Sequence, residues 1–164
     1  MKNVKESHKL TIGRAEEISF DNLHLTGVPA KVDSGAYRSA IHAQHITLST
    51  DGKILTFELL GGHPVCGAMA KRISTGSYKM VTVENSFGHK EERYEVILKV
   101  TLGTKSFNSS FSLADRSKKI YPILLGRKLL NGRYIIDTSN SSINRKELKE
   151  RYQVSFPNDE EDNR

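Results

Sequence analysis

The sequence predicts an all-β protein, a small closed β-barrel with one or two short helices. Short segments in which apolar and polar residues alternate recur along the chain, and turn-forming pairs such as Asp51-Gly52 separate them. Helical patterns are confined to two short segments, and the chain lacks the alternation of strands and helices that builds a parallel sheet. A hydrophobic content of 37% in 164 residues is enough for one domain with its own core.

The barrel domain is expected to span residues 10–152. Residues 1–9 predict a disordered lead, and residues 153–164 predict a disordered acidic tail. The strand-forming segments are residues 10–14, 17–20, 23–32, 53–60, 78–84, 93–102, 105–114, 120–125 and 133–137. Residues 37–46 have a mixed pattern that favours a short returning strand, and residues 65–75 indicate neither strand nor helix.

Local patterns support particular elements. Residues 93–102 give the strongest strand signal, and residues 120–125 form a nearly continuous apolar run that predicts burial on both faces. Glycines bound a short helical segment at residues 126–132. Residues 144–147, Asn-Arg-Lys-Glu, fit a capping pattern and predict a helix through about Tyr152.

Charge and cysteine usage limit the function classes. The net charge is +6, and four of the 19 acids lie at residues 159–162 with Arg164 as the only base beyond residue 158, so residues 1–158 carry +9. This surplus of positive charge favours an acidic partner, which could be nucleic acid, an anionic surface or an acidic peptide. The alternative is that the extra lysines and arginines only keep the surface solvated. The basic residues are scattered and no nucleic-acid motif is present, which makes nucleic acid the less favoured partner.

Location is predicted from what the sequence does not contain. No run approaches the ~20 apolar residues of a membrane helix, and the polar start lacks the apolar core of a signal peptide. The single cysteine, Cys66, excludes an internal disulfide. We therefore expect a cytoplasmic protein that does not interact with membranes.

The first chemical motif is Asp33-Ser34-Gly35-Ala36, which follows a predicted strand. Backbone N–H groups of such a turn can hold the carboxylate, and Gly35 lets the main chain approach it closely. Aspartic peptidases use Asp-Ser/Thr-Gly-Ala in this role, although Asp-Ser-Gly is also common in ordinary turns. We take Asp33, Ser34 and Gly35 as the candidate catalytic loop.

A second motif, Ile123-Leu-Leu-Gly-Arg127, precedes the short helical segment. It resembles the segment of retropepsins that crosses beneath the Asp-Ser/Thr-Gly loop and supports it. Smaller matches occur in a consistent order along residues 10–143: Ile12-Gly-Arg14, Ala30–Ala36, Ser39–His42, Gly88–Glu91 with Arg93, Leu124–Arg127, and Ile136-Asp137 with Ser141. This series resembles a bacterial retropepsin-like aspartic peptidase family that carries the labels ATP-dependent zinc protease and RimK-associated peptidase.

The resemblance implies roles for residues around the loop. Leu125, Gly126 and Arg127 are expected to support it, with Arg127 in a structural ion pair. The residues that follow the catalytic loop are the candidates for substrate binding: Ala36, Tyr37, Arg38 and His42. Lys128 occupies the position where viral retropepsins carry Asp, so the usual pairing at this point is in question. Gly61-Gly62 and residues 72–92 are both candidates for the flap that covers the cleft.

Aspartic proteolysis requires two carboxylates that share a proton, and one chain supplies one such loop. Asp137-Thr138-Ser139 is similar, but Ser139 replaces the glycine, so Asp137 is expected to end a strand. The resemblance therefore implies a homodimer in which Asp33 meets its symmetry mate. The association with RimK, a ligase that adds glutamates to a protein tail, favours an acidic peptide or protein substrate.

The family labels raise two cofactor questions. The chain lacks a Gly-x-x-x-x-Gly-Lys-Ser/Thr phosphate loop, so nothing supports ATP hydrolysis. The spacing of His42 and His45 suits zinc, but His-Glu-x-x-His is absent, and we expect no cofactor. Three functions remain open: an aspartic peptidase, a non-catalytic module that binds an acidic peptide, and a zinc hydrolase that uses His42, His45 and Asp33.

Overall fold

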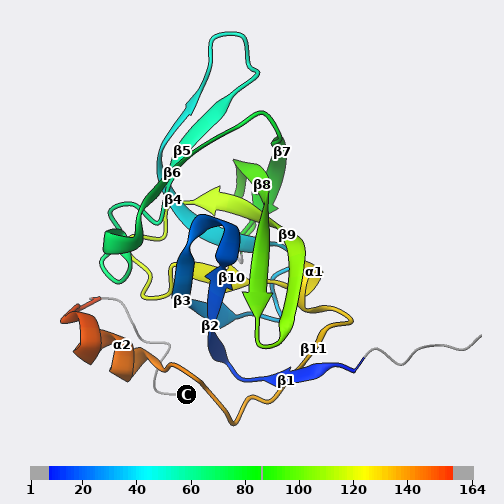
Figure 1. Cartoon of the computed structure of the whole chain (residues 1–164), viewed down its shortest axis with the longest axis vertical. Helices are drawn as coiled ribbons and strands as arrows, with labels where there is room; N and C mark the ends of the chain where they lie inside the picture. The colour runs from blue at the N-terminus through cyan, green and yellow to red at the C-terminus, as the bar shows by residue number, and fades with distance from the viewer. Residues whose placement is uncertain (1–7, 86, 157–164) are drawn as a thin grey trace, which may run out of the picture.

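The computed structural model describes residues 8–85 and 87–156, and the chain is mostly β structure (Figure 1). The strands are β1 (Leu10–Ile12), β2 (Ala15–Phe20), β3 (Leu25–Val32), β4 (Ser39–Leu48), β5 (Leu55–Leu59), β6 (Lys71–Thr75), β7 (Lys79–Glu84), β8 (Lys90–Leu102), β9 (Lys105–Ala114), β10 (Ile123–Leu125) and β11 (Tyr134–Ile136). The helices are α1 (Arg127–Leu130) and α2 (Arg145–Tyr152), with 3-10 turns η1 (Asp21–Leu23) and η2 (Gly67–Met69). The predicted all-β class with two short helices is confirmed.

Six strands pair into a closed ring. The strands β2, β3, β8 and β9 pair antiparallel as neighbours in the order β3-β2-β8-β9, and β9 then pairs parallel with β4. The short strand β10 closes the ring, because it pairs parallel with β3 and antiparallel with β4. Fully buried apolar side chains from the ring strands form the main core, and the Phe20 and Phe111 rings meet edge to face at 5.9 Å.

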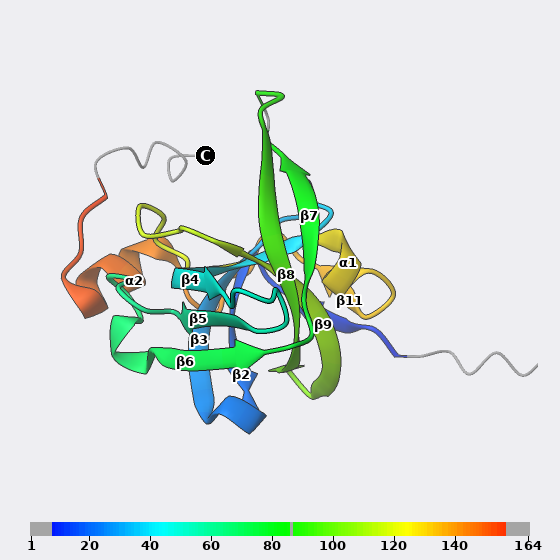
Figure 2. The same ribbon diagram turned by 90° about the horizontal axis from the view of Figure 1, so that it is seen from above.

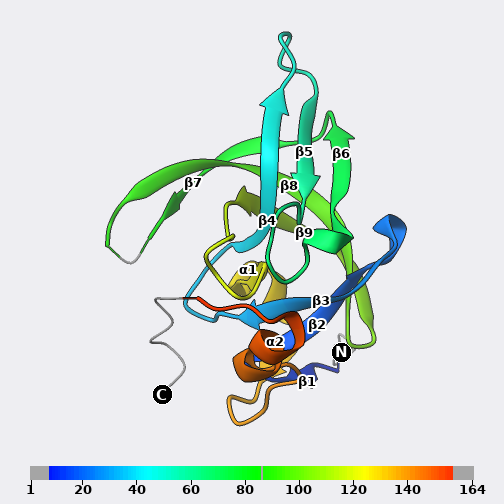
Figure 3. The ribbon, with the colours of Figure 1, turned by 90° about the vertical axis from the view of Figure 1, so that its left-hand side faces the viewer.

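Two strand pairs extend beyond the ring. The pair β4–β5 rises from one side and continues into β6, as Figure 3 shows. The pair β7–β8 forms a long arm that projects outward in Figure 2. A separate two-stranded parallel sheet joins β1 to β11, so the first and last strands are paired with each other.

Helix α2 covers a second, smaller apolar cluster. The Asn144 side chain accepts a hydrogen bond from the Glu147 backbone N–H at 2.9 Å, which is the predicted cap. Leu148 is fully buried, and the Tyr121 hydroxyl donates to the Ile143 carbonyl at 2.9 Å. The cluster also includes Phe156, so packing continues four residues beyond the predicted domain end. The rest of the predicted tail, residues 157–164, and most of the lead, residues 1–7, lie outside the described residues.

The element boundaries differ from the prediction in two places. The strand predicted at residues 120–125 begins only at Ile123, because Pro122 has no N–H to donate to a neighbouring strand. Its apolar residues are nevertheless buried, except for the half-buried Leu124. Residues 65–75, left unassigned from the sequence, form η2 and β6. Within the described residues, no helix has the length and apolar character needed to cross a membrane.

Candidate active site

The Asp33 loop lies directly after β3, and hydrogen bonds within the loop and to β10 hold it in place. The Asp33 backbone N–H donates to the Leu125 carbonyl at 2.9 Å, and the Gly35 N–H donates to the Asp33 carboxylate at 2.9 Å. The Ala36 N–H closes the turn on the Asp33 carbonyl at 3.2 Å. A Cβ at residue 35 would lie 3.1 Å from the same carboxylate oxygen, so glycine keeps this approach open.

Strand β10 and the start of α1 lie beneath this loop. The Arg127 N–H donates to the Ala36 carbonyl at 2.8 Å, and the Lys128 N–H donates to the Tyr37 carbonyl at 2.9 Å. A Cβ at Gly126 would lie 2.6 Å from the Arg38 backbone, a distance that no side chain tolerates. The absence of a side chain at residue 126 therefore lets the supporting segment reach the Asp33 loop.

The cationic residues of this segment pair differently from expectation. Arg127 was expected to form an ion pair, but its Nη1 donates to the Ser34 carbonyl at 3.0 Å. Lys128 instead extends its Nζ to 3.9 Å from the Glu95 carboxylate. A lysine at this position is therefore compatible with a retropepsin-like loop, because the acid that partners it comes from β8.

Glu95 is a buried carboxylate that sequence reasoning missed, and we call its cluster the Glu95 anchor. The side chain is 1% exposed and accepts from Arg38 Nη1 at 2.6 Å. Lys79 Nζ, directly across the strand pair, lies 3.4 Å away, and Lys128 Nζ completes the set. The anchor joins the catalytic loop, α1 and β7. No local signal distinguishes Glu95 in the sequence, because β8 also carries Glu91, Glu92 and Arg93 close by.

A cleft of about 760 Å³ opens beside the Asp33 carboxylate. Its lining residues come from the catalytic loop, β4, β7, β8, β9, β10 and the loop after β9: Asp33, Gly35, Ala36, Tyr37, Arg38, Ala40, Thr82, Val83, Glu84, Asn85, Arg93, Ser112, Arg116 and Leu124. Residues 82–85 belong to the β7–β8 arm, so this arm lines the cleft. Of the two flap candidates, this favours residues 72–92, because Gly61-Gly62 does not line the cleft.

Three of the four expected substrate-binding residues line this cleft, and one does not. Ala36, Tyr37 and Arg38 are lining residues, whereas His42 is buried on β4 with 2% of its surface exposed. Its Nε2 bonds the Gly61 carbonyl at 2.7 Å, and its Nδ1 accepts the Arg116 backbone N–H at 2.9 Å. His42 is therefore a structural residue, in contrast to the expected role of reading the substrate.

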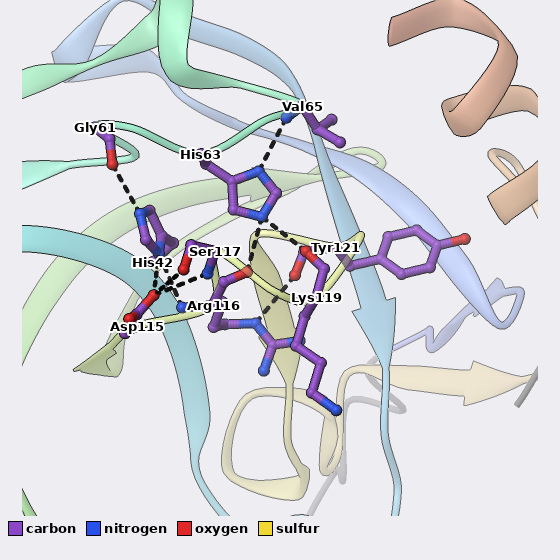
Figure 4. A network of polar contacts seen from close by, with 9 residues as sticks. All are labelled: His42, Gly61, His63, Val65, Asp115, Arg116, Ser117, Lys119 and Tyr121. Atoms are coloured by element: carbon purple, nitrogen blue, oxygen red, sulfur yellow. Dashed lines mark hydrogen bonds and ion pairs between the residues drawn. The ribbon is translucent and has the colours of Figure 1, made fainter. Parts of the chain in front are cut away.

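His42 on β4 and His63 connect the loop after β5 and the loop after β9 to the ring (Figure 4). His63 Nδ1 accepts the Val65 N–H at 3.1 Å, and its Nε2 lies 2.8 Å from the Lys119 carbonyl. Burial lowers the pKa of His63 to about 4, so it stays neutral at physiological pH. Loss of the acceptor nitrogen on protonation would break the bond to Val65.

The zinc alternative does not fit these residues. Both His42 nitrogens already bond backbone groups, and the exposed His45 ring turns to Glu58 at 3.2 Å. Burial also raises the pKa of the Cys66 thiol to about 12, which disfavours the thiolate that binds metal. Within residues 8–85 and 87–156, no group of three His, Cys, Asp or Glu side chains is arranged to hold a metal ion.

Asp137 does not supply a second catalytic loop. It directly follows β11, and its carboxylate accepts from the Ser139 N–H and hydroxyl and from Asn140. Asp137 is half-buried and is not among the residues that line the cleft. The cleft of this chain therefore contains one aspartate, Asp33, among the described residues.

Comparison with known proteins identifies the family. Residues 11–147 match the RimB-like family, described as the retropepsin-like aspartic endopeptidase RimB. The chain belongs to this family. The description names an aspartic endopeptidase and mentions neither zinc nor ATP.

The curated relatives are longer proteins. One from Shewanella pealeana, named probable alpha-L-glutamate ligase, is 32% identical over 139 residues, which are 82% of this chain and 30% of that protein. A protein of the same name from Parasynechococcus marenigrum is 30% identical over 139 residues, 82% of this chain and 29% of that protein. The chain thus spans less than a third of the length of these relatives.

A solved structure shares the fold. The crystal structure of a Legionella pneumophila protein described as of unknown function superposes with a TM-score of 0.63 at 24% identity. The match covers 82% of this chain and 97% of that one. The overall fold is thus shared with an experimental structure.

Proposed function

We propose that this RimB-like chain is an aspartic peptidase that acts as a homodimer, with one Asp33 from each copy. The observation that carries the proposal is the Asp33 loop itself, with its carboxylate bonded by the Gly35 N–H at one edge of a cleft. Gly126 and β10 support this loop as retropepsins support theirs. Family membership supports the same chemistry.

The second carboxylate comes from the second copy. In the dimer one Asp33 accepts a proton from the attacking water, and the protonated Asp33 of the other copy donates to the scissile carbonyl. The loop is suited to such an approach, since Ser34 and Gly35 are exposed in the single chain. The hydrogen bond from Arg127 to the Ser34 carbonyl limits movement of the loop.

The substrate is proposed to be an acidic peptide or protein that carries added glutamates. The relatives named alpha-L-glutamate ligases contain a segment similar to this chain within a longer polypeptide. A ligase that joins glutamate and a peptidase that removes it act on the same bond in opposite directions. The net charge of +9 on residues 1–158 favours such a substrate.

The deciding experiment is hydrolysis of a glutamate-tailed peptide by wild type, Asp33→Asn and Asp137→Asn. We expect Asp33→Asn to abolish hydrolysis while Asp137→Asn retains it, because Asp137 lies outside the cleft. Far-ultraviolet circular dichroism confirms that both variants are folded. Full activity of Asp33→Asn would refute the aspartic mechanism. Binding of the peptide by a wild type that never cleaves it would instead indicate a binding module.

Dimer formation has its own test. Sedimentation equilibrium measures the mass in solution, and activity per chain should fall on dilution below the dimer dissociation constant. Adding excess Asp33→Asn chain to a fixed amount of wild type should lower activity, because mixed dimers carry one functional carboxylate. Activity proportional to wild-type concentration at every dilution, with no inhibition by the variant, would contradict the shared site.

A further inference from the structure

Two arginines in the cleft are poorly neutralised by the protein itself. Arg93 on β8 and Arg116 in the loop after β9 both line the cleft beside Asp33. The third lining arginine, Arg38, already has a buried partner in the Glu95 anchor. Of the three arginines that line the cleft, Arg38 is therefore paired with a buried acid, whereas Arg93 and Arg116 face the space that a substrate enters.

The contacts of Arg93 leave part of its guanidinium unused. Its Nη2 bonds Glu91 at 3.1 Å, but Glu91 is an exposed neighbour two residues away on the same strand. The Nε of Arg93 is buried and has no hydrogen-bond partner among the described residues. The charge of Arg93 is thus paired only with the exposed Glu91 among the described residues, and 22% of the side chain remains accessible to an incoming anion.

Arg116 is anchored at one point only. Its Nε donates to the Tyr121 carbonyl at 3.0 Å, and this is the one hydrogen bond that its side chain makes within residues 8–85 and 87–156 (Figure 4). Burial, and then repulsion by Arg93, lower the pKa of Arg116 to about 10, while Asp33 opposes this shift. The guanidinium thus stays protonated at neutral pH and lies close to both Arg93 and Asp33.

Adjacent guanidinium groups in a partly desolvated cleft favour an anion between them. A carboxylate matches the planar fork of a guanidinium and forms paired, charge-assisted hydrogen bonds with it. The other acid in the cleft lining besides Asp33 is Glu84, which is exposed on β7. A substrate carboxylate beside the scissile bond would therefore meet two cations with little competition from the protein.

We propose that Arg93 and Arg116 form a carboxylate-binding subsite that selects substrates with an acidic group next to the cleaved bond. This inference rests on the proposed peptidase function and specifies how its cleft recognises glutamate. The bound group is either the side-chain carboxylate of a glutamate residue or the terminal carboxylate of the chain. In both cases the two guanidiniums orient the substrate, and Asp33 acts on the neighbouring peptide bond.

The test compares four peptides that contain one cleavable segment. Two are glutamate-tailed peptides that end in a free carboxylate or an amide, and two are the glutamine-tailed equivalents. Wild type should prefer at least one carboxylate over its neutral counterpart by about 10- to 100-fold in kcat/KM, the range expected for hydrogen bonds to a charged group. The free-acid and amide arms show whether the terminal or the side-chain carboxylate is the one bound.

The variants assign the selectivity to these residues. Arg93→Gln and Arg116→Lys should remove most of the preference, measured as the ratio of kcat/KM for a carboxylate peptide to kcat/KM for its neutral counterpart. Arg72→Gln on β6 removes an exposed arginine outside the cleft and is the matched control, expected to keep the preference. Thermal unfolding of each variant identifies a loss that arises from misfolding. Arg93→Gln is the more informative variant, because the ion pair that it removes, with Glu91, is at the surface.

Failure of the inference and failure of the proposed function give different results. Equal hydrolysis of all four peptides by wild type, or an unchanged preference in folded Arg93→Gln and Arg116→Lys, would overturn the subsite and leave the peptidase intact. If wild type hydrolyses none of them, titration calorimetry of Asp33→Asn with the same peptides still tests recognition. The subsite is supported if the peptides with a carboxylate bind more tightly than their neutral counterparts and if adding Arg93→Gln abolishes this difference. Equal binding of all four peptides would overturn it.

Discussion

Replacing Glu95 by glutamine is expected to destabilise the protein and loosen the catalytic loop at the same time. The substitution keeps the shape of the side chain but removes the charge that Arg38, Lys79 and Lys128 share. Three cations then face one another around a position that is 1% exposed. Removing one partner from a buried charge cluster leaves the others without compensation.

The size of the effect follows from the exposure of each partner. The hydrogen bond from Arg38 at 2.6 Å is the shortest, and a buried bond of this charged kind contributes about 1.5–3 kcal/mol. Lys79 is 63% exposed and Lys128 is 38% exposed, so water screens both and each adds at most about 1 kcal/mol. We expect a total loss of about 2–4 kcal/mol, which lowers Tm by roughly 5–15 °C in a chain of this size.

Thermal and urea unfolding measure this loss, and peptide hydrolysis reports on the loop. Glu92→Gln, an exposed glutamate of the same strand, is the matched control and should change stability by less than about 0.5 kcal/mol. Lys79→Gln should cost less than Glu95→Gln, since it removes one screened partner. If Glu95→Gln unfolds at the same temperature and urea concentration as Glu92→Gln, the anchor contributes nothing and the reasoning is refuted.

Three further outcomes are expected. Gly126→Ala should destabilise the protein by about 1–3 kcal/mol and lower hydrolysis, because the new Cβ meets the Arg38 backbone at 2.6 Å. The control Gly67→Ala, whose new Cβ has its nearest contact at 3.7 Å, should be tolerated. Equal stability of the two variants in urea unfolding would argue against the Arg38 contact. The free energy of unfolding should fall as pH is lowered from 6.5 toward 4, by up to about 1.4 kcal/mol per pH unit, because unfolded His63 takes up a proton that the folded state refuses. His63→Gln should flatten this slope, and an unchanged slope would assign it to other groups. Cys66 should react with Ellman's reagent only on unfolding, since burial raises its pKa to about 12, and rapid labelling of the native protein would show that the thiol is accessible.

Much of the strand pattern was predictable because it depends on local alternation. The segments around β8 and β9 have regular patterns, and the sequence placed them to within a few residues. The start of β10 after Pro122 was missed, because apolar content predicts burial while a strand also needs a donor at each paired position. Residues 65–75 gave no signal, since β6 acquires its conformation by pairing with β5.

The sequence by itself pointed to Asp33-Ser34-Gly35 as a candidate catalytic loop, because such a turn needs the backbone freedom of glycine, and its resemblance to retropepsins pointed to the Gly126 segment as the support. Tertiary structure alone decided which other residues share the site. It buried His42 behind the cleft, supplied Glu95 from a distant strand, and brought Arg93 and Arg116 beside Asp33. These contacts join residues up to 83 positions apart, and no local pattern encodes such pairings, which arise only when the ring of strands closes.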